Sequence, residues 1–213
     1  EIEKSVRAET KQAISTLYQI GESNKEKYLD FPHSEIETKE FIDGFNWNFP
    51  WNAGAHFASL CVFSKTQLDD LDFAQSKFIL ENNISRYLSK ETGSYHNSSV
   101  SSSEEVINGA MKVISGLDWL SSEIHYPEKL IDFCLKNSSK DDGCHITDLV
   151  YVFYQCLKVT DHRKSEVVTN LESLKAKIYT HYFPEQGGFS YYFQKSQQFY
   201  YGGKITHGEN VPD

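Results

Sequence analysis

Apolar residues recur every three to four positions along most of the chain, which predicts a mainly helical protein. Residues 2–20 carry their apolar side chains on one broad face, and Gly21 follows as a helix stop. Residues 34–45 open with Ser34 and have Glu37 three positions later, the spacing of a capping box. About eight helices are predicted in all, and no segment reads convincingly as a strand.

Two kinds of helix alternate after these first two. The predicted helices that are apolar nearly all round cover 54–64, 108–118 and 145–157, and those with one polar face cover 70–90, 126–137 and 164–182. A helix that is apolar all round must be surrounded by other elements, whereas an amphipathic helix faces water on one side. The alternation therefore predicts an inner and an outer ring of helices.

Glycines recur with this alternation. The apolar helices are each predicted to open on a Gly-X-X element, at Gly54, Gly109 and Gly143. Two of the amphipathic helices are followed by glycine turns that contain Gly93 and Gly188. Aligning the first helix pair with the last brings these turns into register after a six-residue insertion, which indicates a loose internal repeat.

The two turns carry a resemblance to a known superfamily. Residues 91–95 read Glu-Thr-Gly-Ser-Tyr and residues 186–191 read Gln-Gly-Gly-Phe-Ser-Tyr. They are similar to the turns that follow the outer helices of the terpenoid cyclase and protein prenyltransferase superfamily, over roughly residues 45–205. The resemblance implies an all-α fold of the α/α toroid type, in which inner helices surround a central cavity and outer helices enclose them.

We expect one toroid-like domain over residues 1–213, with N-terminal helices in 1–45 and helix-pair repeats in 46–205. A full ring of about six helix pairs needs more residues than this. We therefore expect the toroid to be incomplete or open, or the native chain to continue.

A zinc site is one interpretation of the start of the last apolar helix. The resemblance implies two ligands here, because prenyltransferase-like proteins of the superfamily use an Asp-x-Cys element at such a position, and Asp142 and Cys144 have that spacing. The alternative is that Asp141 or Asp142 caps the helix while Cys144 packs. The Asp-x-Asp-Asp motif of class II cyclases is absent, since residues 69–72 read Asp-Asp-Leu-Asp.

The candidate catalytic residues are His56, His145 and Asp148. The two histidines occupy matching positions when Gly54 is aligned with Gly143, so both are predicted to face the cavity of the toroid. Asp148 lies three residues after His145, on the same helix face, and the pair could perform general acid–base chemistry. The alternative is a buried polar network that serves only structure.

Aromatic residues supply the candidate substrate-binding groups. Trp47 and Trp51 lie in the loop before the first apolar helix, and Tyr191 lies in the last glycine turn. Exposed rings beside a cavity would suit either an isoprenoid chain or a sugar ring. The alternatives are a hydrophobic staple for the tryptophans and ordinary packing for the tyrosine.

Charge and composition narrow the partners. The net charge of −9 argues against nucleic acid, which binds through clustered basic residues. No apolar run approaches the roughly 20 residues of a membrane-spanning helix. The four cysteines form no CxxC pair, so we expect reduced thiols and a cytoplasmic protein.

Three functions remain open at this point. The first is an enzyme of the terpenoid cyclase or prenyltransferase type that binds a lipid or isoprenoid substrate in an apolar cavity, with zinc as its candidate cofactor. The second is a carbohydrate-active toroid, such as a glycan hydrolase, lyase or epimerase. The third is a non-catalytic module that binds a ligand or a partner.

Overall fold

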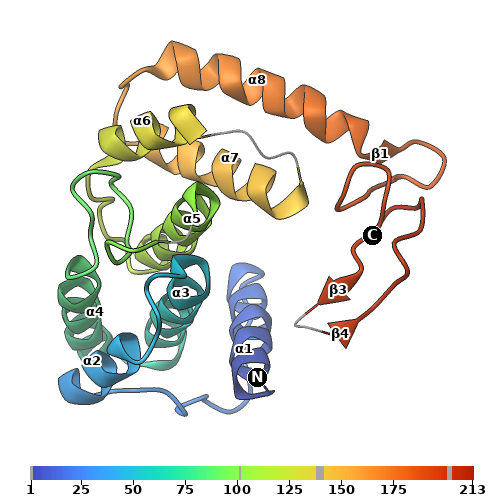
Figure 1. Cartoon of the computed structure of the whole chain (residues 1–213). Helices are drawn as coiled ribbons and strands as arrows, with labels where there is room; N and C mark the ends of the chain where they lie inside the picture. Colours follow the sequence, from blue (N-terminus) through green and yellow to red (C-terminus); the bar gives the residue numbers. More distant parts are fainter. Residues whose placement is uncertain (1, 101, 138–141, 201–202) are drawn as a thin grey trace. The chain divides into compact units, whose positions relative to one another are not determined.

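The chain is mostly helical, which confirms the all-α prediction (Figure 1). A computed structural model describes residues 2–100, 102–137, 142–200 and 203–213. The described helices are α1 (Ile2–Gln19), α2 (Glu35–Asp43), α3 (Pro50–Gln67), α4 (Asp70–Ser85), α5 (Ser103–Trp119), α6 (Pro127–Asn137), α7 (Gly143–Leu157) and α8 (Lys164–Thr180). The described strands form two short antiparallel pairs, β1 (Tyr182–Phe183) with β2 (Gly188–Phe189) and β3 (Phe199–Tyr200) with β4 (Gly203–Lys204). None of the described helices is both long enough and apolar enough to cross a membrane.

The chain divides into two compact units, Glu1–Tyr126 and Pro127–Asp213. The predicted boundary between N-terminal helices and repeats, at residue 45, is not a boundary between units. Helices α1 and α2 belong to the first unit, where α1 packs on α3 and α2 packs on α4.

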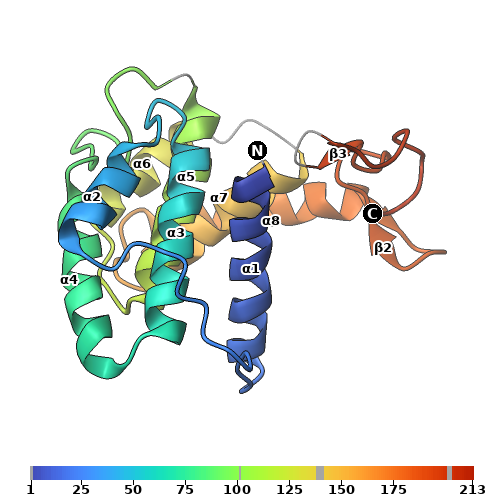
Figure 2. The ribbon, with the colours of Figure 1, turned by 90° about the horizontal axis from the view of Figure 1, so that it is seen from below.

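Helix α3 is the central helix of the first unit. It lies between α1 and α4 and packs most extensively on α5, as Figure 2 shows from a second direction. Most of its residues are buried, which its nearly uniform apolar sequence requires. The helix starts at Pro50 rather than near Gly54, because proline suits the first turn, where its missing N–H costs no hydrogen bond.

The glycines of the predicted Gly-X-X elements have a different role in the first unit. Gly54 and Gly109 lie inside α3 and α5, so the prediction that they open these helices is wrong, and only Gly143 begins a helix. A Cβ on Gly54 would lie 3.1 Å from the carbonyl oxygen of Gly109, and one on Gly109 would lie 2.6 Å from Cβ of Pro50. The two glycines therefore allow α3 and α5 to approach closely.

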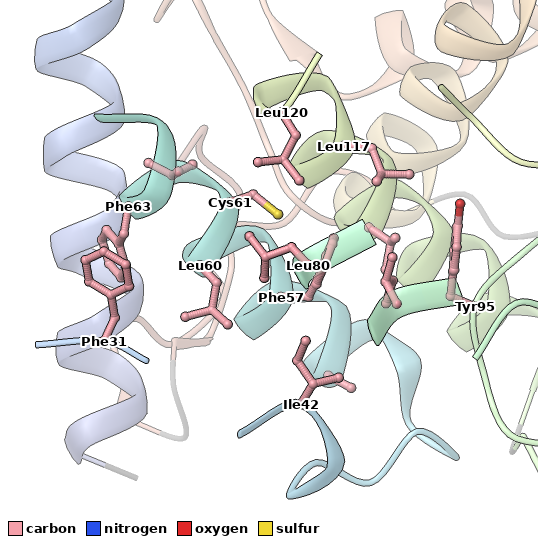
Figure 3. Packing of buried hydrophobic residues seen from close by; sticks show 14 of the residues in the cluster. Phe31, Ile42, Phe57, Leu60, Cys61, Phe63, Leu80, Tyr95, Leu117 and Leu120 are labelled. Atoms are coloured by element: carbon pink, nitrogen blue, oxygen red, sulfur yellow. The ribbon is translucent and has the colours of Figure 1, made fainter. Parts of the chain in front are cut away.

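The core of the first unit surrounds this contact. Figure 3 shows aromatic and aliphatic side chains of α3 packed between α4 and α5, with Phe31 and Phe63 toward α1. Phe57, Phe63 and Tyr95 are among the largest fully buried side chains. Burying a side chain of this size contributes roughly 1.5–3 kcal/mol each.

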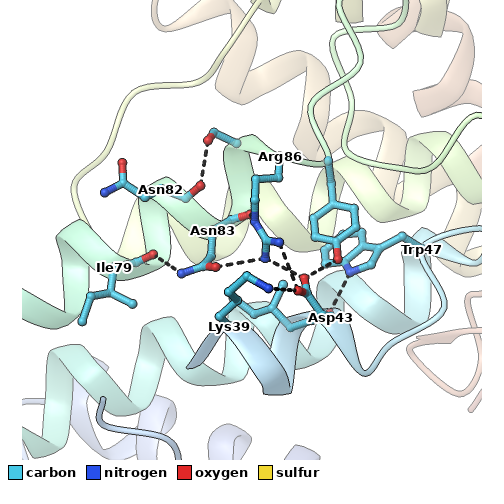
Figure 4. A network of polar contacts seen from close by, with 10 residues as sticks. Lys39, Asp43, Trp47, Ile79, Asn82, Asn83 and Arg86 are labelled. Atoms are coloured by element: carbon cyan, nitrogen blue, oxygen red, sulfur yellow. Dashed lines mark hydrogen bonds and ion pairs between the residues drawn. The ribbon is translucent and has the colours of Figure 1, made fainter. Parts of the chain in front are cut away.

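A polar network joins α2 to the end of α4 (Figure 4). Both guanidinium NH groups of Arg86 donate to the carboxylate of Asp43, at 2.6 and 3.0 Å. Lys39 and the hydroxyl of Tyr87 donate to the same carboxylate at 2.8 and 2.7 Å. Together, and chiefly through Arg86, they hold the pKa of Asp43 well below its usual range.

The second unit consists of three helices in mutual contact, α6, α7 and α8, followed by the two strand pairs. Fully buried side chains come from all three helices: Leu130 and Cys134 from α6, Val152 and Phe153 from α7, and Val167 from α8. The apolar α7 thus packs against two amphipathic neighbours, as the alternation of helix types predicts.

A backbone pattern repeats between the units with an offset of 94 residues. Each repeat has an apolar helix, an amphipathic helix and a tight hairpin, which we name the first hairpin (87–96) and the second hairpin (181–190). The outer helices match, since α4 begins at Asp70 and α8 at Lys164.

The hairpins match bond for bond. Gly93 N–H donates to the oxygen of Ser89 at 2.9 Å, and Gly187 N–H donates to that of Phe183 at 2.8 Å. The ends close through His96 to Tyr87 at 2.8 Å and through the corresponding Ser190 to His181 at 2.9 Å. Both glycines have φ of 73°, a conformation that side chains disfavour. Gly93 therefore corresponds to Gly187, not to Gly188 as the sequence alignment predicts.

Candidate functional site

The start of α7 and the end of the second hairpin lie against each other. The backbone N–H of Gly143 donates to the carbonyl oxygen of Tyr191 at 2.9 Å. A Cβ at position 143 would lie 3.0 Å from Cδ2 of the Tyr191 ring, so glycine is the residue that permits this approach. The structure thus brings the predicted substrate-binding tyrosine to the predicted metal and catalytic residues of the same unit.

Asp142 and His145 face each other across the first turn of α7. The carboxylate oxygen Oδ1 of Asp142 lies 3.7 Å from Nε2 of His145, and their side chains are 31% and 18% exposed. Asp142 occupies the N-cap position with an extended backbone, but its side chain makes no capping hydrogen bond. The alternative prediction, that Asp142 caps the helix, is therefore correct about its N-cap position, but the side chain makes no capping hydrogen bond. Asp141, the other predicted cap, lies outside the described residues.

Cys144 and Tyr191 form the second contact of the site. The Tyr191 hydroxyl and the Cys144 side chain share a hydrogen bond. Burial first, and then this bond and the charge of nearby Asp142, raise the pKa of Tyr191 far above its usual range. Tyr191 therefore keeps its proton at neutral pH and acts as a hydrogen-bond donor.

The backbone around Tyr191 is held from a distance. Its N–H donates to Oδ2 of Asp213 at 2.5 Å, and the N–H of Gln197 donates to Oδ1 at 2.7 Å. Asp213 is absent from the predicted site, because nothing in the spacing of a turn-rich segment indicates a contact 22 residues away. Its carboxylate holds the backbone of this segment at both Tyr191 and Gln197.

The described residues supply no third ligand for the predicted zinc site. Within the part of the chain that the structure describes, no group of three or more histidine, cysteine, aspartate or glutamate side chains is placed to hold a metal ion. Asp142 and Cys144 lie close in sequence, but a zinc centre takes at least three protein ligands. The described residues therefore do not fit the metal that the resemblance implies.

The cysteines differ sharply in access. All four are free, as predicted from their spacing. Cys61, Cys134 and Cys156 are fully buried, and burial raises the pKa of each of these three thiols. Cys144 is only partly buried. It is therefore the thiol that a reagent in solution can reach.

The structure does not place the two histidines in equivalent positions. His56 lies two turns into α3, whereas His145 lies in the first turn of α7. The 94-residue offset instead matches His145 with Trp51. The predicted equivalence is wrong, because it relied on glycines that do not both begin a helix. Asp148, one turn after His145, is 3% exposed.

His56 belongs to a stack of rings in the first unit. It is 5% exposed and lies flat on Phe45, with ring centroids 4.3 Å apart. A guanidinium nitrogen of Arg7 lies 3.3 Å from its Nδ1, and the same guanidinium covers the ring of Phe41 at 4.7 Å. Arg7 and Phe41 line an open cleft of about 360 Å³, so His56 supports the wall of that cleft.

The tryptophans also lie in the first unit. Trp47 is 1% exposed, its Nε1–H donates to the oxygen of Ile42 at 2.9 Å, and its ring stacks on Tyr87 at 4.3 Å. The prediction that Trp47 is exposed is therefore wrong. Trp51 is half-buried, and its backbone N–H donates to the carboxylate of Glu105 at 3.1 Å.

Four predicted residues thus meet in one place: Asp142, Cys144, His145 and Tyr191. We name these four the α7 cluster. Comparison of the chain with protein-family models, with curated proteins and with solved structures finds no match.

Proposed function

We propose that this chain is part of a helical-repeat protein of the terpenoid cyclase and prenyltransferase type, with an α/α toroid architecture, and that it acts on a lipid or isoprenoid molecule. Two features support this proposal. Each 94-residue repeat pairs an apolar helix with an amphipathic one, and in the second repeat the hairpin returns to the start of the apolar helix. This is the arrangement that the resemblance implies.

The α7 cluster is the proposed reactive site, and the contact between Gly143 and Tyr191 is the observation that carries the assignment. The protonated Tyr191 hydroxyl would donate a hydrogen bond to the polar end of the substrate. His145 would move a proton, with Asp142 orienting its ring. Cys144 lies beside both and would contact the bound molecule directly.

A lipid suits the observations better than a glycan. The glycan hypothesis depends on two exposed tryptophans, and one of them, Trp47, is fully buried. At the α7 cluster, the predicted substrate-binding aromatic residue is Tyr191, which is only partly exposed. We also infer a cytoplasmic protein, because four free cysteines are typical of a reducing compartment.

Protection of Cys144 from alkylation tests this function. The native chain would be treated with iodoacetamide, with or without farnesol, and the modification of Cys144 would be followed by peptide mass spectrometry. We expect farnesol to slow the reaction at least about fivefold, because a molecule bound at the α7 cluster covers the thiol. A neutral hexose oligosaccharide serves as the competing probe.

Two tyrosine variants make the test specific. Tyr191→Phe removes the hydroxyl that contacts Cys144 and should weaken the protection. Tyr192→Phe is the matched control, because its ring lies beside Tyr191 but is 41% exposed, and it should leave the protection unchanged. Protection by the oligosaccharide alone would favour the carbohydrate-active alternative. Protection by neither probe would contradict a ligand site at the α7 cluster.

A further inference from the structure

The open cleft of about 360 Å³ lies in the first unit, apart from the α7 cluster. Residues of α1, of the loop before α2 and of α2 itself line it. Its volume is near the lower end of the range for small-molecule sites, roughly 300–1,000 Å³. Half of its lining is apolar and consists of Leu29, Phe31, Pro32 and Phe41. The cleft can therefore hold a small molecule that has an apolar portion.

Arg7 places a positive charge in the wall of this cleft. Its guanidinium lies over the ring of Phe41, 4.7 Å from the centroid, and donates to Nδ1 of the buried His56 at 3.3 Å. No carboxylate of the described residues forms an ion pair with Arg7. A guanidinium that packing holds in place, and that no carboxylate neutralises, is suited to bind a carboxylate from solution.

Asp30 places a negative charge in the same cleft. Across the part of the chain that the structure describes, its side chain forms no ion pair either, so Arg7 does not neutralise it by direct contact. The other carboxylate of the lining, Glu37, already accepts the backbone N–H groups of His33 and Ser34, at 3.3 and 3.1 Å. The cleft thus offers one available group of each sign.

The phenol of Tyr28 lies near both charges. Burial is the main cause that raises its pKa; the charge of Asp30 raises this pKa further, and the charge of Arg7 lowers it. Because the effect of a charge falls with distance, both charges act close to this one ring. The loop that carries Asp30 is fixed on its other side, where Nε2–H of His33 donates to the carbonyl oxygen of Leu29 at 3.0 Å. The two charges are therefore held at one place.

We infer that this cleft binds a zwitterionic small molecule of the amino-acid type with an apolar side chain. Arg7 binds its carboxylate, Asp30 binds its ammonium group, and its apolar side chain lies against Phe31 and Phe41. A ligand with both charges compensates both groups of the cleft at once. A ligand with a single charge leaves one of them without a partner.

Calorimetric titration of the full chain with L-phenylalanine at pH 7 tests this site. Two analogues serve as matched probes, since 3-phenylpropionate lacks the ammonium group and phenethylamine lacks the carboxylate. We expect saturable binding of L-phenylalanine, and binding at least about tenfold weaker for each analogue, because each loses one charge-assisted hydrogen bond. Absence of saturable L-phenylalanine binding, or equal affinity for an analogue, would overturn the inference.

Three variants assign the two charges to their residues. Arg7→Met should weaken L-phenylalanine binding at least about tenfold and leave phenethylamine binding unchanged. Asp30→Asn should weaken L-phenylalanine to the same degree and leave 3-phenylpropionate binding unchanged. Glu26→Gln is the control, because it removes an exposed carboxylate of the same loop that does not line the cleft.

The variants also separate binding from folding. Thermal melts would verify that each variant folds, and Asp30→Asn, at an exposed position, remains informative if the loss of the Arg7 contacts destabilises the first unit. An equal loss of binding in Glu26→Gln and Asp30→Asn would contradict the assignment. None of these outcomes depends on the farnesol experiment, which reads the modification of Cys144 in the second unit.

Discussion

The close contact between α3 and α5 can be tested by adding one methyl group. In the variant Gly109→Ala, the new Cβ would lie 2.6 Å from Cβ and 2.8 Å from the carbonyl carbon of Pro50. Real Cβ atoms do not approach other atoms this closely, so one of the two helices must move. The second of these atoms belongs to the backbone, which cannot relax by rotating a side chain.

The expected loss of stability follows from two opposing effects. Overpacking of a well-packed contact costs about 1–3 kcal/mol, and the backbone clash places Gly109→Ala in the upper part of this range. Alanine recovers about 1 kcal/mol relative to glycine through its higher helix propensity. We therefore expect the free energy of unfolding to fall by about 1–2 kcal/mol, and the melting temperature by roughly 3–8 °C.

Tryptophan fluorescence during urea unfolding is the suitable assay. All three tryptophans, Trp47, Trp51 and Trp119, lie in the first unit and report on its unfolding. Gly203→Ala is the control for adding a methyl group to a glycine, because its Cβ would lie 3.4 Å from the nearest atom, an ordinary contact at an exposed site. Since Gly203 lies in the second unit, both variants would also be followed by circular dichroism. If Gly109→Ala is as stable as the native chain, the helices do not meet as described.

Substitutions at three further positions test other parts of the structure. Arg86 lowers the pKa of Asp43, so the carboxylate of Asp43 stabilises the fold above about pH 4, and this stabilisation is lost as the pH falls through the folded pKa. In urea titrations, Asp43→Asn should therefore reduce the loss of unfolding free energy between about pH 4 and about pH 2. An equal loss in the native chain and the variant would contradict the network. Ser34→Ala removes one half of the capping box of α2 and should cost about 1 kcal/mol in the same assay, whereas an unchanged midpoint would show that the cap contributes nothing. Gly187→Ala should cost roughly 1–2 kcal/mol in thermal melts, because φ is 73° at this position, and no clash contributes since no atom lies within 4 Å of the added Cβ. Gly187→Asn should cost less, because asparagine adopts the left-handed conformation more readily than alanine. Equal stability of the native chain and both variants would refute the left-handed turn.

The helices could be predicted because their signals are local. Periodicity places the described helices, and the Ser34 capping box marks the start of α2 correctly. The start of α3 was harder to locate, because its N-cap residue is Phe49, whose side chain makes no capping bond. In this segment, Pro50 is the residue whose type indicates the start of a helix.

Exposure could not be predicted where the covering residue is distant in sequence. Trp47 lies in a loop of asparagine and aromatic residues that suggests a rim, but Tyr87, 40 positions later, covers its ring. Asp213 reaches the α7 cluster in the same long-range way. By contrast, three members of the cluster are within four consecutive residues, so the sequence alone places them together.

The 94-residue offset could not be predicted from the sequence, because backbone hydrogen bonds do not depend on side-chain identity. Ser89 corresponds to Phe183 and Tyr95 to Phe189, yet the bonds are the same within 0.1 Å. Only the position with φ of 73° demands glycine, and the sequence offers two adjacent glycines at 187 and 188. The choice between them was decided by geometry.

The same offset bears on where chemistry can reside. At the positions of Asp142, Cys144, His145 and Tyr191, the first repeat has Asn48, Pro50, Trp51 and Asn97. None of these four carries an ionisable side chain, and Asn97 instead donates its backbone N–H to the oxygen of Trp47 at 3.1 Å. In the first repeat, the residue after the hairpin therefore contacts the loop before the inner helix, and the reactive groups are absent from these four positions. This difference argues that the contact itself serves the fold, and that the α7 cluster was added to it, so substitutions within the cluster should change ligand binding more than they change stability.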